Sequence, residues 1–188
     1  MIRSAFRYDV RIPGRRPFIF TPFFTPMRTA LAALLLVALP LIGSAQGRMP
    51  SIVVQGLDGK KVNTSTWSND GKPIIVNFWA TWCAPCRKEM PLLEQIHKKY
   101  APLGFTMLGI NVEEDTTHME AFLGDVPVTF PVLLDPANHV SKLYDVAAMP
   151  STVIIDRKGQ VRYIHQGWQP GDESRYQDVI RQLIRERT

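Results

Sequence analysis

The chain has 188 residues, of which 45% are hydrophobic and two are cysteines, and its formal net charge at pH 7 is +5. Residues 1–45 contain six arginines and one aspartate, so residues 46–188 hold 16 basic and 16 acidic side chains and are formally neutral. This balance gives no support for nucleic-acid binding, and two cysteines are too few for a disulfide-rich scaffold. The length of residues 46–188 suits one domain with a sizeable core, which we expect to be a monomer.

Residues 1–45 have the pattern of a secretory leader. An apolar run from Ala30 to Ile42 follows Arg28, and Gly43-Ser44-Ala45 supplies the small residues that a signal peptidase reads. Because the apolar run is too short to span a bilayer comfortably, we predict a signal sequence cleaved after Ala45 and a periplasmic or otherwise extracytoplasmic protein. Met27 is an alternative start of the chain. An uncleaved membrane anchor and a buried globular helix are the alternative interpretations.

Strand patterns and helix patterns alternate along residues 46–188. The run 74–79 is almost entirely apolar, which is typical of a central parallel strand covered on both faces. Pro91 falls inside the helical pattern that follows and should kink it. This alternation predicts an α/β fold with helices on both faces of a sheet. In chain order, we predict a hairpin at 51–62, a strand at 74–79, a helix at 87–100, a strand at 105–112, a helix at 116–123, a strand at 132–134, a helix at 140–144, a hairpin of strands 152–156 and 161–165, and a helix at 172–187.

The two cysteines, Cys83 and Cys86, lie between the predicted strand 74–79 and the helix that follows it. Their spacing is that of a reversible intramolecular disulfide or of half a zinc site. A zinc site needs two further Cys or His ligands at close spacing, and a c-type haem attachment needs a histidine where Arg87 stands. We therefore predict redox chemistry with no metal and no cofactor. A pair of buried structural thiols is the alternative.

The position of the pair at the start of a helix assigns a role to each thiol. Cys83 should be exposed at the mouth of the helix, where unpaired N–H groups and the positive end of the dipole stabilise a thiolate. Pro85 suits the first turn, because its missing N–H is no loss there. Cys86 lies three residues further on, one turn deeper. We therefore predict that Cys83 is the nucleophile and that Cys86 is the shielded resolving thiol.

The run Trp82-Cys83-Ala84-Pro85-Cys86, preceded by Asn77-Phe78-Trp79-Ala80-Thr81, resembles the thioredoxin superfamily and, more narrowly, the TlpA/ResA/CcmG group of extracytoplasmic thiol–disulfide oxidoreductases. The resemblance extends from about Pro50 to Ile184. It implies a thioredoxin-like fold with a central mixed sheet flanked by helices, an N-terminal β-hairpin and an inserted helix–strand segment. The other stretches that carry it are Gly56-Leu57-Asp58-Gly59-Lys60, Gly109-Ile110-Asn111-Val112-Glu113-Glu114-Asp115, Phe130-Pro131-Val132-Leu133-Leu134-Asp135 and Met149-Pro150-Ser151-Thr152.

The resemblance also implies residues that bind substrate or tune the thiols. Trp82 and Pro85 adjoin the cysteines. Pro150 is expected to follow a cis peptide bond and to stand against the disulfide, which would expose the backbone of Met149 to the extended chain of a partner protein.

Two positions concern proton transfer. Asn77 stands where thioredoxins proper have a buried acid, so we expect that base to be absent. Glu114 resembles the acid that the ResA-type group places near its cysteines, and we expect it, rather than Glu113, to tune thiol protonation. The alternative is that Glu113, Glu114 and Asp115 form a solvated acidic cluster at the start of a helix.

The function that the resemblance implies is the reduction of protein disulfides. The expected clients are the haem-binding cysteines of apocytochrome c or the copper-site cysteines of oxidases, and the expected electron donor is a membrane thiol protein of the DsbD/CcdA type. Ala84-Pro85 adds no cation beside the thiolate, so the reduction potential should lie nearer thioredoxin's, roughly −270 mV, than a strong oxidant's, roughly −120 mV. A disulfide-forming oxidant and a copper-binding chaperone that uses Cys83, Cys86 and either Met149 or a histidine are the alternatives.

Overall fold

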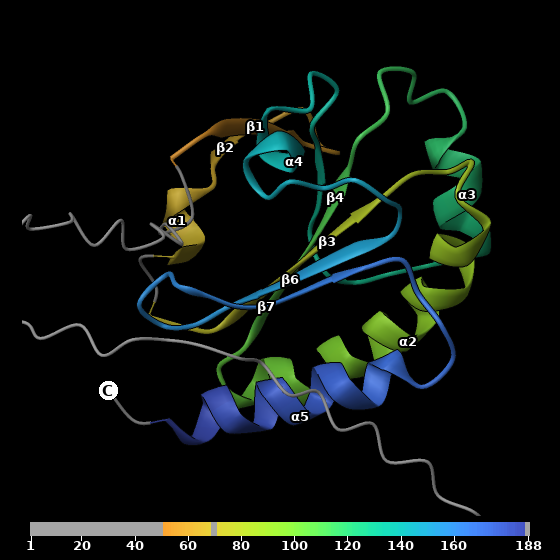
Figure 1. Cartoon of the computed structure of the whole chain (residues 1–188). Coiled ribbons are helices and arrows are strands. Elements are labelled where there is room, and N and C mark those ends of the chain that lie inside the picture. The colour runs from red at the N-terminus through yellow and green to blue at the C-terminus, as the bar shows by residue number, and fades with distance from the viewer. Residues whose placement is uncertain (1–50, 69–70, 187–188) are drawn as a thin grey trace, which may run out of the picture. The chain divides into compact units, whose positions relative to one another are not determined.

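The computed structural model describes residues 51–68 and 71–186 (Figure 1). The predicted leader at 1–45, its cleavage after Ala45 and the alternative start at Met27 lie outside these residues. In the part of the chain that is described, no helix is long and apolar enough to cross a membrane.

The centre of the fold is a mixed sheet of seven strands, counted over the described residues. The spatial order is β2-β1-β5-β4-β3-β6-β7. The two pairs β3–β4 and β4–β5 are parallel and the other pairs are antiparallel, so the predicted central mixed sheet is confirmed. The strands are β1 (Val53–Gly56), β2 (Lys61–Asn63), β3 (Ile74–Trp79), β4 (Thr106–Asn111), β5 (Val132–Leu134), β6 (Ser151–Ile155) and β7 (Val161–Gln166).

Helices flank this sheet, and two of them matter most for function. Figure 1 shows α2, in green, and α5, in blue, side by side along one side of the sheet. The opposite face of β3 receives Tyr144, which follows α4 and packs its ring 5.9 Å from that of Phe78. The helices are α1 (Ser65–Ser68), α2 (Ala84–Tyr100), α3 (Met119–Asp125), α4 (His139–Leu143) and α5 (Asp172–Arg185), and a 3-10 turn (Ala101–Leu103) follows α2.

The central strand β3 explains where the core lies. All six of its residues are buried, because the sheet covers both edges and helices cover both faces. Side chains alternate along a strand, so Asn77 and Trp79 point to one face and Phe78 to the other. Asn77 is the only polar residue in this strand, and it faces α2 through a hydrogen bond to Glu89.

Most of the predicted elements are present. The N-terminal hairpin and the inserted segment, formed by α3 and β5, are confirmed. Helix α2 begins at Ala84, before the apolar pattern at 87–100, because Cys83 caps it and Pro85 occupies its first turn, as those two positions predicted, and it continues through Pro91. Helix α3 covers Met119–Asp125 rather than 116–123, because Asp115 holds the preceding residues in a turn by accepting the backbone N–H of Thr117.

Candidate active site

The two cysteines form a disulfide at the junction of β3 and α2. Cys83 takes the N-cap position of α2, and its Sγ accepts a hydrogen bond from the backbone N–H of Cys86 at 3.2 Å. The unpaired N–H groups and the dipole at this helix end stabilise negative charge on that sulfur. In the reduced protein, the same geometry favours a thiolate on Cys83.

The disulfide is less accessible than the sequence indicated. Cys83 is only 4% exposed, because the bond joins its Sγ to that of Cys86, which is fully buried. Pro85, between the two cysteines, is exposed, and Trp82, directly before them, is 69% exposed. An incoming disulfide would therefore meet Trp82 and Pro85 before it reaches the sulfur of Cys83.

The start of β6 lies beside the cysteine loop. The antiparallel register pairs Phe78, near the end of β3, with Ser151, the first residue of β6. Pro150 therefore adjoins the segment that leads from β3 to Cys83. The Met149–Pro150 bond is cis, as the resemblance implied. Pro150 is buried and Met149 is half-buried, so the backbone before β6 lies at the rim of the site.

A buried carboxylate lies one helical turn beyond Cys86. Glu89 is 1% exposed and accepts hydrogen bonds from Asn77 Nδ2 to Oε2 at 2.8 Å and from the Tyr176 hydroxyl to Oε1 at 3.0 Å. The hydroxyl of Thr152 lies 3.4 Å from Oε1. Burial raises the pKa of Glu89 to about 7, although these three hydrogen bonds oppose the shift. A carboxyl group with such a pKa can both accept and return a proton near neutral pH.

Sequence reasoning missed Glu89. It found no acid in the strand, because Asn77 stands there, but the structure supplies the carboxylate to the same place from the facing helix. A signal was present in the sequence. Glu89 interrupts the apolar stripe of α2 next to Met90, three residues after Cys86, and an acid in such a stripe must find polar partners when it is buried.

These features place the chain among known proteins. Residues 44–180 match the Redoxin family. The chain belongs to the Redoxin family. It is 34% identical over 149 residues to the thiol-disulfide oxidoreductase ResA of Geobacillus kaustophilus (strain HTA426), a match that covers 79% of this chain and 77% of that protein. It is also 35% identical over 130 residues to the thioredoxin-like protein YneN of Bacillus subtilis (strain 168), covering 67% and 74% of the two chains.

A solved structure supports the same assignment. The crystal structure of a putative thiol:disulfide interchange protein DsbE from Chlorobium tepidum matches with a TM-score of 0.68 and 33% sequence identity, over 73% of this chain and 95% of that one. This Redoxin-family protein is therefore a thiol–disulfide oxidoreductase of the ResA/DsbE type within the thioredoxin superfamily, with Cys83 and Cys86 as its Cys-x-x-Cys pair.

The structure separates the two neighbouring glutamates after β4. Glu114 is exposed, whereas Glu113 is half-buried and turns toward the cysteine loop. The carboxylate of Glu113 accepts the backbone N–H and the hydroxyl of Thr81, both at 2.7 Å, and the amide of Asn111 at 2.8 Å. Glu113 thus ties the end of β4 to the loop that carries Trp82. The expected tuning of the thiols by Glu114 stays a prediction.

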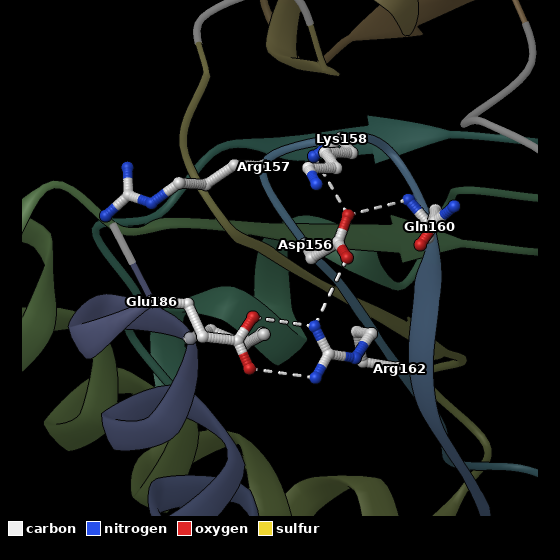
Figure 2. A pocket seen from close by; sticks show the side chains of 7 residues that line it. Asp156, Arg157, Lys158, Gln160, Arg162 and Glu186 are labelled. Carbon is white, nitrogen blue, oxygen red and sulfur yellow. Dashed lines mark hydrogen bonds and ion pairs between the residues drawn. The ribbon is translucent and has the colours of Figure 1, made fainter. Parts of the chain in front are cut away.

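Figure 2 shows a pocket, of about 310 Å³, at the other end of β6 from Pro150. Three of its charged side chains, Asp156, Arg162 and Glu186, bind one another. Arg162 donates to both carboxylate oxygens of Glu186, at 2.7 and 2.9 Å, and to Asp156 at 3.3 Å. These contacts tie the β6–β7 hairpin to the end of α5, so we assign this pocket a structural role. Its lining residues are Asp156, Arg157, Lys158, Gln160, Arg162, Leu183 and Glu186.

The different environments of the two sulfurs predict selective labelling. In the folded, reduced oxidoreductase, iodoacetamide at neutral pH should alkylate Cys83 at least about tenfold faster than Cys86, because one unit of pKa difference changes the thiolate fraction about tenfold. Cys83 caps the N-terminus of α2 and is slightly exposed to solvent, whereas Cys86 is fully buried. Peptide mass spectrometry of time points measures both rates. Equal rates would contradict the assignment of nucleophile and resolving thiol.

Proposed function

We propose that this oxidoreductase reduces disulfides of other proteins outside the cytoplasm. The observation that favours reduction over oxidation of the substrate is the buried Glu89, one helical turn beyond Cys86. Its carboxylate is held by hydrogen bonds from uncharged donors. An ionised carboxylate near a thiolate disfavours the thiolate, and Ala84-Pro85 adds no compensating cation. Destabilising the thiolate destabilises the dithiol form, which makes the pair a better reductant.

The proposed reaction has two exchange steps. The Cys83 thiolate attacks one sulfur of a substrate disulfide, which forms a mixed disulfide and releases the first substrate thiolate. Cys86 then gives its proton to the Glu89 carboxylate and attacks the sulfur of Cys83, which releases the second substrate thiolate. Two electrons pass from the enzyme to the substrate, which becomes a dithiol after it takes up two protons. The enzyme is left with the Cys83–Cys86 disulfide.

The surroundings of the pair suit a protein substrate. The exposed Trp82 and Pro85 offer an apolar surface before the sulfur. The half-buried Met149, which precedes the cis bond to Pro150, is the proposed contact for an extended chain. We propose apocytochrome c or copper-site proteins as clients, and a membrane thiol protein of the DsbD/CcdA type as the donor that restores the dithiol. The leader pattern at 1–45 supports an extracytoplasmic location, with 46–188 as the catalytic domain.

The reduction potential tests the proposed direction. Equilibrating the purified protein with glutathione or dithiothreitol buffers, followed by acid quenching and alkylation, should give a value nearer roughly −270 mV than roughly −120 mV. At about 1.4 kcal/mol per 30 mV, these two potentials differ by about 7 kcal/mol, which is enough to decide whether the protein reduces or oxidises its substrate. A value near the oxidant end, or a pair found mainly oxidised in cells that have the donor, would make the protein a disulfide-forming enzyme instead.

A further inference from the structure

The C-terminal helix contributes a side chain to the redox site. Tyr176 lies on the buried face of α5, which packs against α2, and it is fully buried. Its hydroxyl reaches Oε1 of Glu89 at 3.0 Å, although the two residues are 87 positions apart in the chain. A hydrogen bond between two fully buried groups from separate helices fixes both side chains.

The donors to Glu89 differ in strength and origin. Oε2 receives the amide of Asn77 from β3 at 2.8 Å. Oε1 receives Tyr176 at 3.0 Å and the longer contact from Thr152 of β6 at 3.4 Å. Tyr176 is therefore the closer partner of Oε1. A hydroxyl that donates to a carboxylate favours its ionised form, so Tyr176 opposes the effect of burial on Glu89.

The charged and titratable groups around Glu89 come from three elements. Cys86 lies on α2 with Glu89, and Cys83 caps the start of that helix. Asp172, in the first turn of α5, is negative and disfavours the ionised form of Glu89, but it also pairs with His165 of β7 at 2.8 Å. The His165 ring packs edge to face against the ring of Tyr176, with centroids 5.9 Å apart. Tyr176 thus contacts both Glu89 and the ring of His165, which takes part in this part-buried contact with Asp172.

We propose that Tyr176 is a positioning residue for the redox reaction, whose hydroxyl holds the Glu89 carboxylate and sets the pH range in which Glu89 takes the proton of Cys86. This inference rests on the proposed proton-accepting role of Glu89. It makes α5 part of the active site rather than only a cover for the core.

The test separates the two exchange steps. A symmetric aromatic disulfide that releases a coloured thiolate gives two absorbance phases with the reduced protein, the first from attack by Cys83 and the second from attack by Cys86. In Tyr176→Phe, the ring contacts remain and one hydroxyl is lost. The midpoint of the pH profile of the second phase should rise by about one unit, with the second phase about fivefold slower at pH 7, and the first phase should change little.

Two variants provide the comparison. Tyr100→Phe removes a hydroxyl from the same α2–α5 interface, where Tyr100 is 3% exposed and bonds to Gln177, and it should leave both phases unchanged. In Glu89→Gln, Cys86 must lose its proton to solvent, so the second phase should be slower at pH 7 and should follow the ionisation of the Cys86 thiol alone, with a higher midpoint. If Glu89→Gln changes the profile in this way but Tyr176→Phe leaves the midpoint in place, the role of Tyr176 is wrong and that of Glu89 stands. If Glu89→Gln has no effect, the proton role of Glu89 fails and the inference fails with it.

A second substitution covers the case in which Tyr176→Phe does not fold. Incorporating 3-fluorotyrosine at position 176 keeps the hydroxyl and makes it a stronger donor. The midpoint of the second phase should then move downward, opposite to the effect of phenylalanine. An unchanged midpoint in this folded protein would overturn the proposal.

Discussion

Replacing Cys86 with serine should convert the oxidoreductase from a catalyst into a protein that reacts once. Cys83 keeps its helix end and can still attack a disulfide, but no thiol remains to release the substrate. Reduction of a protein disulfide should therefore stop at a mixed disulfide, with turnover lowered by at least about a hundredfold, since resolution must then rely on external thiols. Non-reducing electrophoresis and mass spectrometry of the adduct measure both effects.

The Cys83→Ser variant is the matched control for this trap. It retains Cys86, which is fully buried, and should form no adduct under the same conditions. An adduct on Cys86 in this control, or sustained turnover by Cys86→Ser, would reverse the assigned roles. Identifying the proteins captured by Cys86→Ser in the native compartment tests the proposed clients, because haem-binding or copper-site cysteines should be recovered in the mixed disulfides.

Replacing Glu89 with glutamine should increase stability at high pH. The pKa of Glu89 is raised from 4.5 to about 7 in the fold, so the native state binds an extra proton between these values. The proton bound by native Glu89 stabilises the folded wild-type protein. This stabilisation is lost, and the free energy of unfolding falls, as pH rises from about 4.5 to about 7. The difference between variant and wild type should therefore grow by about 3 kcal/mol from pH 4 to pH 8.

Urea denaturation of the oxidised proteins at several pH values measures this difference. A half-turn of the Asn77 amide would present its Oδ1, which has no hydrogen-bond partner in the structure, to the new amide of Glu89→Gln. Glu114→Gln is the control, because it makes the same chemical change at an exposed position that lacks the buried surroundings of Glu89. A constant difference for Glu89→Gln would show that Glu89 titrates as an ordinary carboxyl. The same Glu114 variant tests the expected tuning of the thiols by Glu114, through the pH profile of Cys83 alkylation.

Local patterns in the sequence were sufficient to predict the α/β fold class and the reactive pair, whereas the cis bond before Pro150 was predicted from the family resemblance. The apolar periodicity of α2 becomes visible only after Cys86, but the positions predicted for Cys83 at the helix mouth and for Pro85 in the first turn match the observed start at Ala84. Capping by a cysteine sulfur has weaker sequence precedent than capping by serine, threonine, aspartate or asparagine.

The proton-handling residues were harder to predict. The sequence predicted that a buried acid is absent, because Asn77 occupies its position in the strand. The packing of α2 on β3 instead places the carboxylate of Glu89 beside Asn77, and such a contact between separate elements is not visible in the sequence. Glu113 and Glu114 are adjacent and chemically equal in the sequence. The carboxylate of Glu113 accepts the backbone N–H and the hydroxyl of Thr81, 32 positions earlier in the chain, and this tertiary contact distinguishes the half-buried Glu113 from the exposed Glu114.

The hydrogen bonds around Glu89 also define when the redox centre becomes complete. They join residues 75 positions apart, at Asn77 and Thr152, and 87 positions apart, at Glu89 and Tyr176. Contacts between such distant residues carry a large loop-closure cost and form after local structure. The cysteines and their helix cap are local and can form early in folding. The complete set of hydrogen bonds around Glu89, in contrast, requires nearly the whole domain, so a chain that ends before α5 would carry the reactive pair without the Tyr176 contact to Glu89.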